Sequence, residues 1–256
     1  MKTQDPTFRR VLALETATPV QALALLDGEV CLEHRVLKVR YNHGSSLLQN
    51  VDQLLKSQGL TVQDIDLFAA GLGPGSFTGL RVGLATAKAL ARAAEKPIVG
   101  VSGLAALAYQ AASFHPGRPV LAAFDARRRE VFGGAYRFDE EAGLTDLLAE
   151  AAFAPAEFVE AARAFATEES APALLIGDGV MAYAELRAFA NEAGVHHLPP
   201  ALAAPSALAI AILGRRRALA TGPDDLVSLE PNYLRPSDAK LPNIQPHPDF
   251  PQSDDG

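Results

Sequence analysis

The sequence predicts an α/β protein built from two similar lobes, each a mixed sheet flanked by helices. Three observations predict this class. Short apolar segments typical of strands alternate with longer segments that carry apolar residues at helical spacing. The layout of residues 11–30, an apolar strand with an acidic end followed by a turn and another strand, returns at residues 120–139. A chain of 256 residues, 48% of them hydrophobic, is large enough for one or two domains.

The first half is expected to begin with a β-meander. VLALE (11–15) and QALALLDGEVCLEHRVL (21–37) read as three strands, with Asp27-Gly28 as the hairpin between the last two. Residues 45–58 read as an amphipathic helix, with Gly59 where a left-handed C-terminal cap belongs. A buried strand over 66–71, a helix over about 78–95 and a strand that starts at Pro97 complete the order βββαβαβ.

The second half repeats this plan. After the strands of residues 120–139, we expect helices near 155–167, over about 180–193 and at about 206–220, with strands at 173–177 and near 195–198. The predicted division is an N-terminal lobe (1–112), a C-terminal lobe (113–221), a segment that packs back on the lobes (222–242) and a disordered tail (243–256). The tail is rich in proline and polar residues.

Composition excludes several classes of protein. The formal net charge of −7 argues against a chain that grips nucleic acid by itself, because phosphate contacts need a basic face. No run of eighteen apolar residues and no signal peptide is evident, so a cytoplasmic location is expected. The single cysteine, Cys31, excludes an internal disulfide and is expected to be a buried thiol.

The stretch GLGPGSFTGLRVGLATAKALA (71–91) allows two interpretations. Its glycine-rich loop, with Ser76 and Thr78 as possible helix caps, could cradle a phosphate or could simply begin the helix. In the helix, Gly79, Gly83, Ala87 and Ala91 recur every fourth residue, and such a stripe lets another backbone approach closely. Spacing alone leaves open whether that neighbour is this chain's own sheet, the helix at 45–58 or a second protein.

Five segments in order, VLALETAT, GLGPGSFTGLRVGLATAKALA, PIVGVSGLAALA, DARRREVFGGAY and EPNYLRP, resemble the TsaB family, formerly called YeaZ. The resemblance runs from about residue 11 to 242. It implies the duplicated fold of actin, Hsp70 and sugar kinases (the ASKHA, or RNase H-like, fold), which agrees with the two repeated halves. It also implies a non-catalytic subunit of the bacterial machinery that makes threonylcarbamoyladenosine beside the anticodon of tRNA.

The resemblance further implies the partners. The related catalytic subunit TsaD would pair with this chain through N-terminal helices, an ATPase subunit TsaE would join the pair, and tRNA would be contacted only through the complex. If the same surface is self-complementary, the isolated chain is also expected to form a homodimer. The residues predicted at the interface are Leu47, Val51, Leu54, Gly79, Gly83 and Ala87.

The catalytic relative carries a metal-binding histidine pair at helical i, i+4 spacing. In the corresponding register this chain has Gly103 and Leu107, so the resemblance implies neither a metal centre nor a cofactor. His43 has Leu47 four residues on and is expected near a helix start, while the adjacent His196 and His197 would point to opposite faces of a strand.

Two carboxylates, Glu15 and Asp125, stand at equivalent turns of the two halves, where nucleotide-binding members of the wider fold place acidic residues. With Ser76 and Thr78 they define a possible vestigial phosphate region, although each carboxylate is also explained as a turn cap. The alternatives to the scaffold role are an ATP-dependent phosphotransferase that uses these carboxylates, an M22-type metallopeptidase, and a module that binds tRNA directly.

Overall fold

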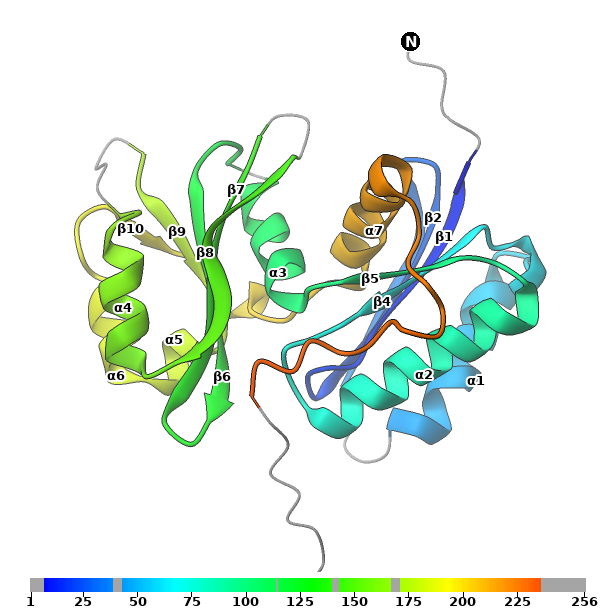
Figure 1. Ribbon diagram of the computed structural model, residues 1–256, viewed down its shortest axis with the longest axis horizontal. Coiled ribbons are helices and arrows are strands. Elements are labelled where there is room, and N and C mark those ends of the chain that lie inside the picture. The colour runs from blue at the N-terminus through cyan, green and yellow to red at the C-terminus, as the bar shows by residue number, and fades with distance from the viewer. Residues whose placement is uncertain (1–6, 39–42, 114, 140–142, 167–170, 236–256) are drawn as a thin grey trace, which may run out of the picture.

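The computed structural model describes residues 7–38, 43–113, 115–139, 143–166 and 171–235 of the chain. They form two lobes side by side, each with a five-stranded sheet (Figure 1). The predicted tail, residues 243–256, and the last residues of the segment 222–242 lie outside the described residues.

The N-terminal sheet has the strand order β3-β2-β1-β4-β5. β1, β2 and β3 form an antiparallel meander, and β4 and β5 add in parallel beside β1. The helices α1 and α2 cover one face of this sheet and α7 covers the other. With both faces covered, β2 is buried along most of its length instead of alternating between buried and exposed residues. The bounds are β1 (Arg10–Glu15), β2 (Val20–Asp27), β3 (Val30–Lys38), α1 (His43–Ser57), β4 (Leu67–Gly71), α2 (Phe77–Ala94), β5 (Ile98–Val101) and α7 (Ala207–Thr221).

The C-terminal sheet has the order β8-β7-β6-β9-β10, with the same pattern of three antiparallel and two added parallel strands. This repeated topology confirms the predicted two-lobe fold, the duplicated fold of actin, Hsp70 and sugar kinases that the sequence resemblance implies. The outer face carries three short helices. The bounds are β6 (Pro119–Arg127), β7 (Glu130–Phe138), β8 (Leu144–Phe153), α4 (Pro155–Arg163), β9 (Ala173–Ile176), α5 (Gly179–Ala182), α6 (Ala184–Phe189) and β10 (Val195–His197).

The inner layer is exchanged between the lobes. The helix α3 (Gly103–Ala112) follows the last strand of the N-terminal sheet but packs on β6 and β7 of the C-terminal sheet. The helix α7 follows the C-terminal strands but packs on β1, β2, β4 and β5 of the N-terminal sheet. The two helices also contact each other between the sheets (Figure 1), so one apolar core runs from sheet to sheet through both of them.

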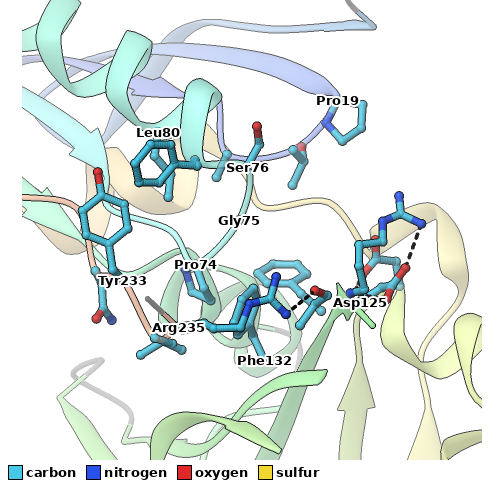
Figure 2. Close-up of a pocket in the computed structure, with 18 residues that line it drawn as sticks. Pro19, Pro74, Gly75, Ser76, Leu80, Asp125, Phe132, Tyr233 and Arg235 are labelled. Carbon is cyan, nitrogen blue, oxygen red and sulfur yellow. Dashed lines mark hydrogen bonds and ion pairs between the residues drawn. The ribbon is translucent and has the colours of Figure 1, made fainter. Parts of the chain in front are cut away.

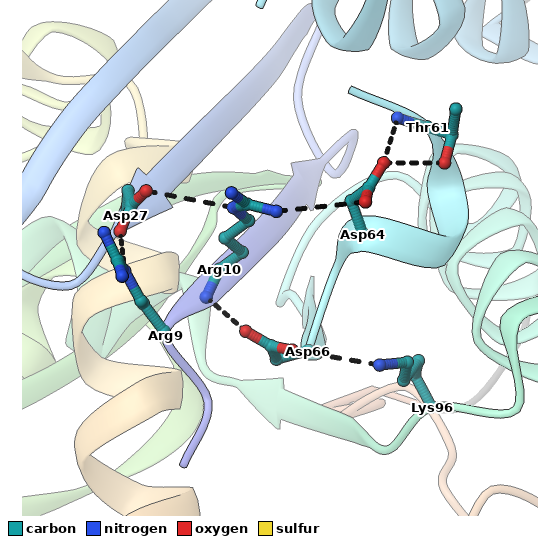
Figure 3. A network of polar contacts seen from close by, with 7 residues as sticks. All are labelled: Arg9, Arg10, Asp27, Thr61, Asp64, Asp66 and Lys96. Atoms are coloured by element: carbon teal, nitrogen blue, oxygen red, sulfur yellow. Dashed lines mark hydrogen bonds and ion pairs between the residues drawn. The ribbon is translucent and has the colours of Figure 1, made fainter. Parts of the chain in front are cut away.

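Polar contacts hold together the edge of the N-terminal sheet where β1 begins (Figure 3). The Arg10 amide donates to Asp66 at 2.8 Å, while the Arg10 guanidinium reaches Asp27 at 3.8 Å and Asp64 at 3.9 Å. Asp64 also accepts hydrogen bonds from the amide and hydroxyl of Thr61. These contacts join β1, β2 and the 3-10 turn Val62–Asp64 that precedes β4.

Several sequence expectations need correction. Cys31 is exposed, because β3 is the edge strand. Residues 144–153, for which no element was predicted, form β8, and the helix predicted over 180–193 is two short helices divided at Tyr183. The helix predicted near 155–167 ends at Arg163. The hairpin at Gly28, the cap at Gly59 and the helix start at His43 are confirmed, the two glycines having φ of 64° and 66°.

Candidate functional site

A cleft of about 550 Å³ opens between the lobes (Figure 2). Its N-terminal wall is the segment after β1 together with the loop that leads into α2, and its C-terminal wall is the end of β6 and the start of β7. Residues 232–235 of the C-terminal segment close one side. Ser76 and Asp125, two of the four residues predicted for a phosphate region, line this cleft.

The loop before α2 acts as a cap. The hydroxyl of Ser76 accepts a hydrogen bond from the Gly79 amide at 3.2 Å, and the amide of Ser76 itself donates to the Ala17 carbonyl at 2.7 Å. Two of the amides that a bound phosphate would need are therefore already paired within the chain. Thr78 is exposed but does not line the cleft, so it adds nothing to an anion site there.

The small-residue stripe of α2 packs against its own chain. A Cβ at Gly79 would lie 2.2 Å from the Thr16 carbonyl oxygen, and a Cβ at Gly83 would lie 2.1 Å from Thr16 Oγ1. The Thr16 hydroxyl donates to the Gly79 carbonyl at 2.8 Å, so the residue that follows β1 is in direct contact with the backbone of α2. Ala87 is fully buried against the same sheet.

The predicted interface residues are thus all interior. Leu47, Val51 and Leu54 of α1 are at most 2% exposed and belong to the same core cluster as Ala87. None of these four, and neither Gly79 nor Gly83, is available on the surface. Contact with a partner stays a prediction for α1 and α2, but it has to use their outward side chains, among them Leu48, which is 54% exposed, and the exposed Ala85 and Ala89.

Asp125 is fully engaged at the end of β6. One carboxylate oxygen accepts from the Tyr183 hydroxyl and the Arg127 amide, each at 2.8 Å, and the other lies 3.0 Å from the Arg127 guanidinium. The Asp125 amide donates to Asp178 at 2.8 Å. Burial raises the pKa of Asp178, and the charge of Asp125 acts in the same direction. The turn-cap interpretation of Asp125 therefore explains its contacts without a ligand.

The turn after Asp125 has an unusual backbone. Arg127, Arg128 and Arg129 all have φ between 54° and 63°, the left-handed region that residues other than glycine seldom adopt. Sequence reasoning identified a turn here but not this conformation, which no pattern of the three arginines indicates.

Glu15 lies outside the cleft lining, although it ends β1. Its side chain is completely buried on the α7 face of the sheet. It occupies the space beside Gly71: a Cβ at Gly71 would lie 1.9 Å from Glu15 Oε2 and 3.1 Å from the Ile210 side chain of α7. The Ala17 amide donates to Oε1, whereas Oε2 has no hydrogen-bond partner among the described residues. Burial raises the pKa of Glu15 to about 7. Glu15 and Asp125 are therefore not brought together as a catalytic pair.

The C-terminal segment joins the lobes across the cleft. The Arg81 guanidinium of α2 lies 3.7 Å from the Phe77 ring centroid and donates to the Tyr233 hydroxyl at 3.0 Å. Further along, Arg235 bonds the Ala126 carbonyl at 3.0 Å and pairs with Glu130 at 2.8 Å. The C-terminal segment thus links α2 to the C-terminal lobe, and no local pattern in the sequence indicates this link.

Within the described residues there is no group of three or more histidine, cysteine or acidic side chains placed to hold a metal ion. Gly103 and Leu107 both lie in α3 and are buried. His196 is exposed and His197 partly buried in the strand β10. None of the helices in the described ranges has both the length and the apolar character needed to cross a bilayer.

Comparisons with known proteins agree with one another. A family model described as "TsaD: tRNA N6-adenosine threonylcarbamoyltransferase" matches residues 38–242. The tRNA threonylcarbamoyladenosine biosynthesis protein TsaB of Escherichia coli (strain K12) is 40% identical over 131 residues, which are 51% of this chain and 56% of that protein. The protein of the same name from Bacillus subtilis (strain 168) is 27% identical over 92% of this chain and 98% of its own length.

The match to the E. coli protein and a similar match to the Haemophilus influenzae TsaB span only about half the length of those relatives, 56% and 51%. Among solved structures, YeaZ from Pseudomonas aeruginosa is 27% identical with a TM-score of 0.74, covering 88% of this chain and 99% of that one. A second structure, described as similar to peptidase YEAZ, is 29% identical with a TM-score of 0.76 and the same coverage.

Proposed function

Because the chain belongs to the TsaB (YeaZ) family, we propose that it takes part in the biosynthesis of threonylcarbamoyladenosine on tRNA as a non-catalytic subunit. In this role it pairs with a TsaD-like catalytic protein, and a TsaE-like ATPase joins the pair. It contacts tRNA only through that complex, in the cytoplasm. The observation that supports the proposal most directly is the similarity to the Bacillus subtilis TsaB, which extends over 92% of this chain and 98% of that protein.

The chemistry of α3 supports a non-catalytic role. Gly103 and Leu107 stand where the resemblance puts the two metal-binding histidines of the catalytic relative, and neither side chain has an atom that can ligate a metal. This speaks against the metallopeptidase alternative. Asp125 is occupied by Tyr183 and Arg127, and Glu15 is buried away from the cleft, so the phosphotransferase alternative has little support.

The partner surface is the outward face of α1 and α2. These helices pack on each other and on the sheet through their buried residues, which holds the outward residues in fixed positions. That face carries Leu48 on α1 and the small exposed residues Ala85 and Ala89 on α2, where another helix could approach closely. If the face is self-complementary, the isolated chain forms a homodimer through it.

The test is co-elution with the TsaD-like protein of the same organism, measured by size-exclusion chromatography with light scattering. Leu48→Arg and Ala89→Arg place a long charged side chain on the face without entering the core, and we expect each to abolish the heterocomplex. Met181→Arg on α5, whose native side chain is 54% exposed on the other lobe, is the matched control and should leave pairing intact. Pairing retained by both face variants would reject this surface, and absence of pairing by the unaltered chain would reject the scaffold role.

A further inference from the structure

A second cavity, of about 570 Å³, lies between the lobes next to the cleft. One wall comes from the end of β5, the start of α3 and the C-terminal half of α7, and the other from β7 and β8. A hydrogen bond at 2.9 Å divides the two spaces: its donor, Asn232, lines the cleft, and its acceptor, Glu150, lines the cavity. Nothing in the proposed scaffold role uses this cavity.

Arg216 brings an unsatisfied positive charge to the α7 wall. Three arginines follow one another there, and their neighbours are paired: Arg215 binds Glu29 and the Phe8 carbonyl, and Arg217 binds Asp224. Arg216 has no acceptor among the described residues, and its Nη1 is buried without a hydrogen bond. Its guanidinium carbon lies 5.7 Å from the centroid of the Tyr109 ring.

A partly buried guanidinium without an acceptor attracts an anionic oxygen strongly, because it has already lost part of its hydration. A carboxylate can take two of its donors at once.

The opposite wall carries an unpaired negative charge. Asp146 on β8 has no hydrogen bond or ion pair within the described ranges, although its charge helps to raise the pKa of Tyr136 and of Glu150, which are more strongly affected by burial. Glu150 accepts hydrogen bonds from Ser102, Tyr136 and Asn232, and Asp139 accepts one from the Gly143 amide. Among the described residues, Asp146 is therefore the carboxylate on this wall with neither a hydrogen bond nor an ion pair, which leaves both of its oxygens open to a cationic group.

From this arrangement we infer that the cavity binds a zwitterion, an amino acid with a large apolar side chain. The ligand's carboxylate lies at Arg216 and its ammonium group at Asp146, while its side chain packs against Val101, Ala105 and Leu213. A phosphate dianion is disfavoured, because three carboxylates line the same space and would repel it. A cavity of this size accommodates an aromatic side chain together with the polar backbone groups.

Isothermal titration calorimetry of the isolated chain tests the inference with three probes. L-phenylalanine has both charges, N-acetyl-L-phenylalanine lacks the ammonium group, and L-phenylalaninamide lacks the carboxylate. We expect L-phenylalanine to bind and each of the other two to bind roughly tenfold more weakly or not at all, since each loses one charged hydrogen-bonding partner.

Arg216→Gln and Asp146→Asn should each weaken L-phenylalanine binding by a similar factor of roughly ten. Arg187→Gln on α6, an exposed arginine away from the cavity, is the matched control and should bind like the unaltered chain. Circular dichroism verifies that the variants are folded, and Asp146→Asn changes an exposed side chain that makes no hydrogen bond or ion pair with the described residues.

Absence of heat with L-phenylalanine up to its solubility limit would overturn the assignment. So would equal binding of N-acetyl-L-phenylalanine, which would indicate an anion site only, or unchanged binding by both variants. The calorimetry needs no partner protein. A negative result would therefore leave the proposed scaffold role unaffected, and a failure to pair with the TsaD-like protein would leave the amino-acid site unaffected.

Discussion

Glu15→Gln measures how much unfolding free energy the chain loses when the buried carboxyl group at the end of β1 ionises. Burial raises the pKa of Glu15 to about 7 from its ordinary value of 4.5, and the hydrogen bonds from the Ala17 and Thr16 amides offset only part of this effect. The folded chain therefore keeps a proton on Glu15 up to neutral pH, whereas the unfolded chain releases it near pH 4.5. Stability contributed by the protonated form is fully present below pH 4.5 and is lost as the pH rises through 7.

The two pKa values set the size of the effect. Their difference corresponds to about 3 kcal/mol of unfolding free energy lost between pH 4.5 and the alkaline side of pH 7. Glutamine has nearly the shape of the protonated acid, keeps an oxygen for the Ala17 amide and cannot ionise. We expect the variant to match the unaltered chain near pH 4 and to exceed it by up to about 3 kcal/mol at pH 8.5.

Urea denaturation followed by far-ultraviolet circular dichroism measures this difference at a series of pH values; the chain has no tryptophan to serve as a fluorescence probe. Burial lowers the pKa of His34 and of His197, which makes the chain more stable as the pH rises through the same range. Because both proteins share these histidines, subtraction removes their contribution. A difference in unfolding free energy that stays constant from pH 5 to 8.5 would refute the reasoning.

Three further outcomes follow from the packing and the polar contacts. Gly83→Ala should destabilise the chain by about 1–3 kcal/mol through overlap with Thr16, and thermal unfolding should show a smaller penalty for the same substitution in a Thr16→Ala background. Asp64→Asn should cost stability above the ordinary carboxylate pKa and cost little in acid, because hydrogen bonds from Thr61 lower the pKa of Asp64; urea titrations at pH 3 and pH 7 measure this. Tyr136→Phe removes one donor to the Glu150 carboxylate and should lower the unfolding free energy by about 1 kcal/mol, as measured in urea at pH 7.

The local signals in the sequence were enough for most of the N-terminal lobe. The apolar run of β1, the turn glycine at Gly28 and the cap at Gly59 each specify a structure within a few residues. The strand β8 was missed, because it is partly exposed, ends its sheet and is interrupted by two irregularities in its pairing with β7. Such a strand shows neither a continuous apolar run nor a regular alternation.

The candidate sites depend on contacts that spacing cannot supply. The stripe through Gly79 and Gly83 predicted a close neighbour, but only the fold shows that this neighbour is Thr16 of the same chain. Similarly, Arg216 and Asp146 lie seventy residues apart in different lobes, and no local pattern indicates that they line one cavity. Glu15 looked like a turn residue, because its burial under α7 depends on the far end of the chain.

Because α3 and α7 each pack on the sheet of the other lobe, the chain cannot be divided at one position into two complete lobes. A fragment that ends at residue 112 would carry a helix whose apolar side chains have lost the sheet they cover, and its own sheet would lack α7 on one face. The complementary fragment would have the reverse defect. Neither half can be expected to survive as an independent module, and two fragments mixed together would have to refold around each other. Because the two lobes share one core through these helices, we expect them to unfold together.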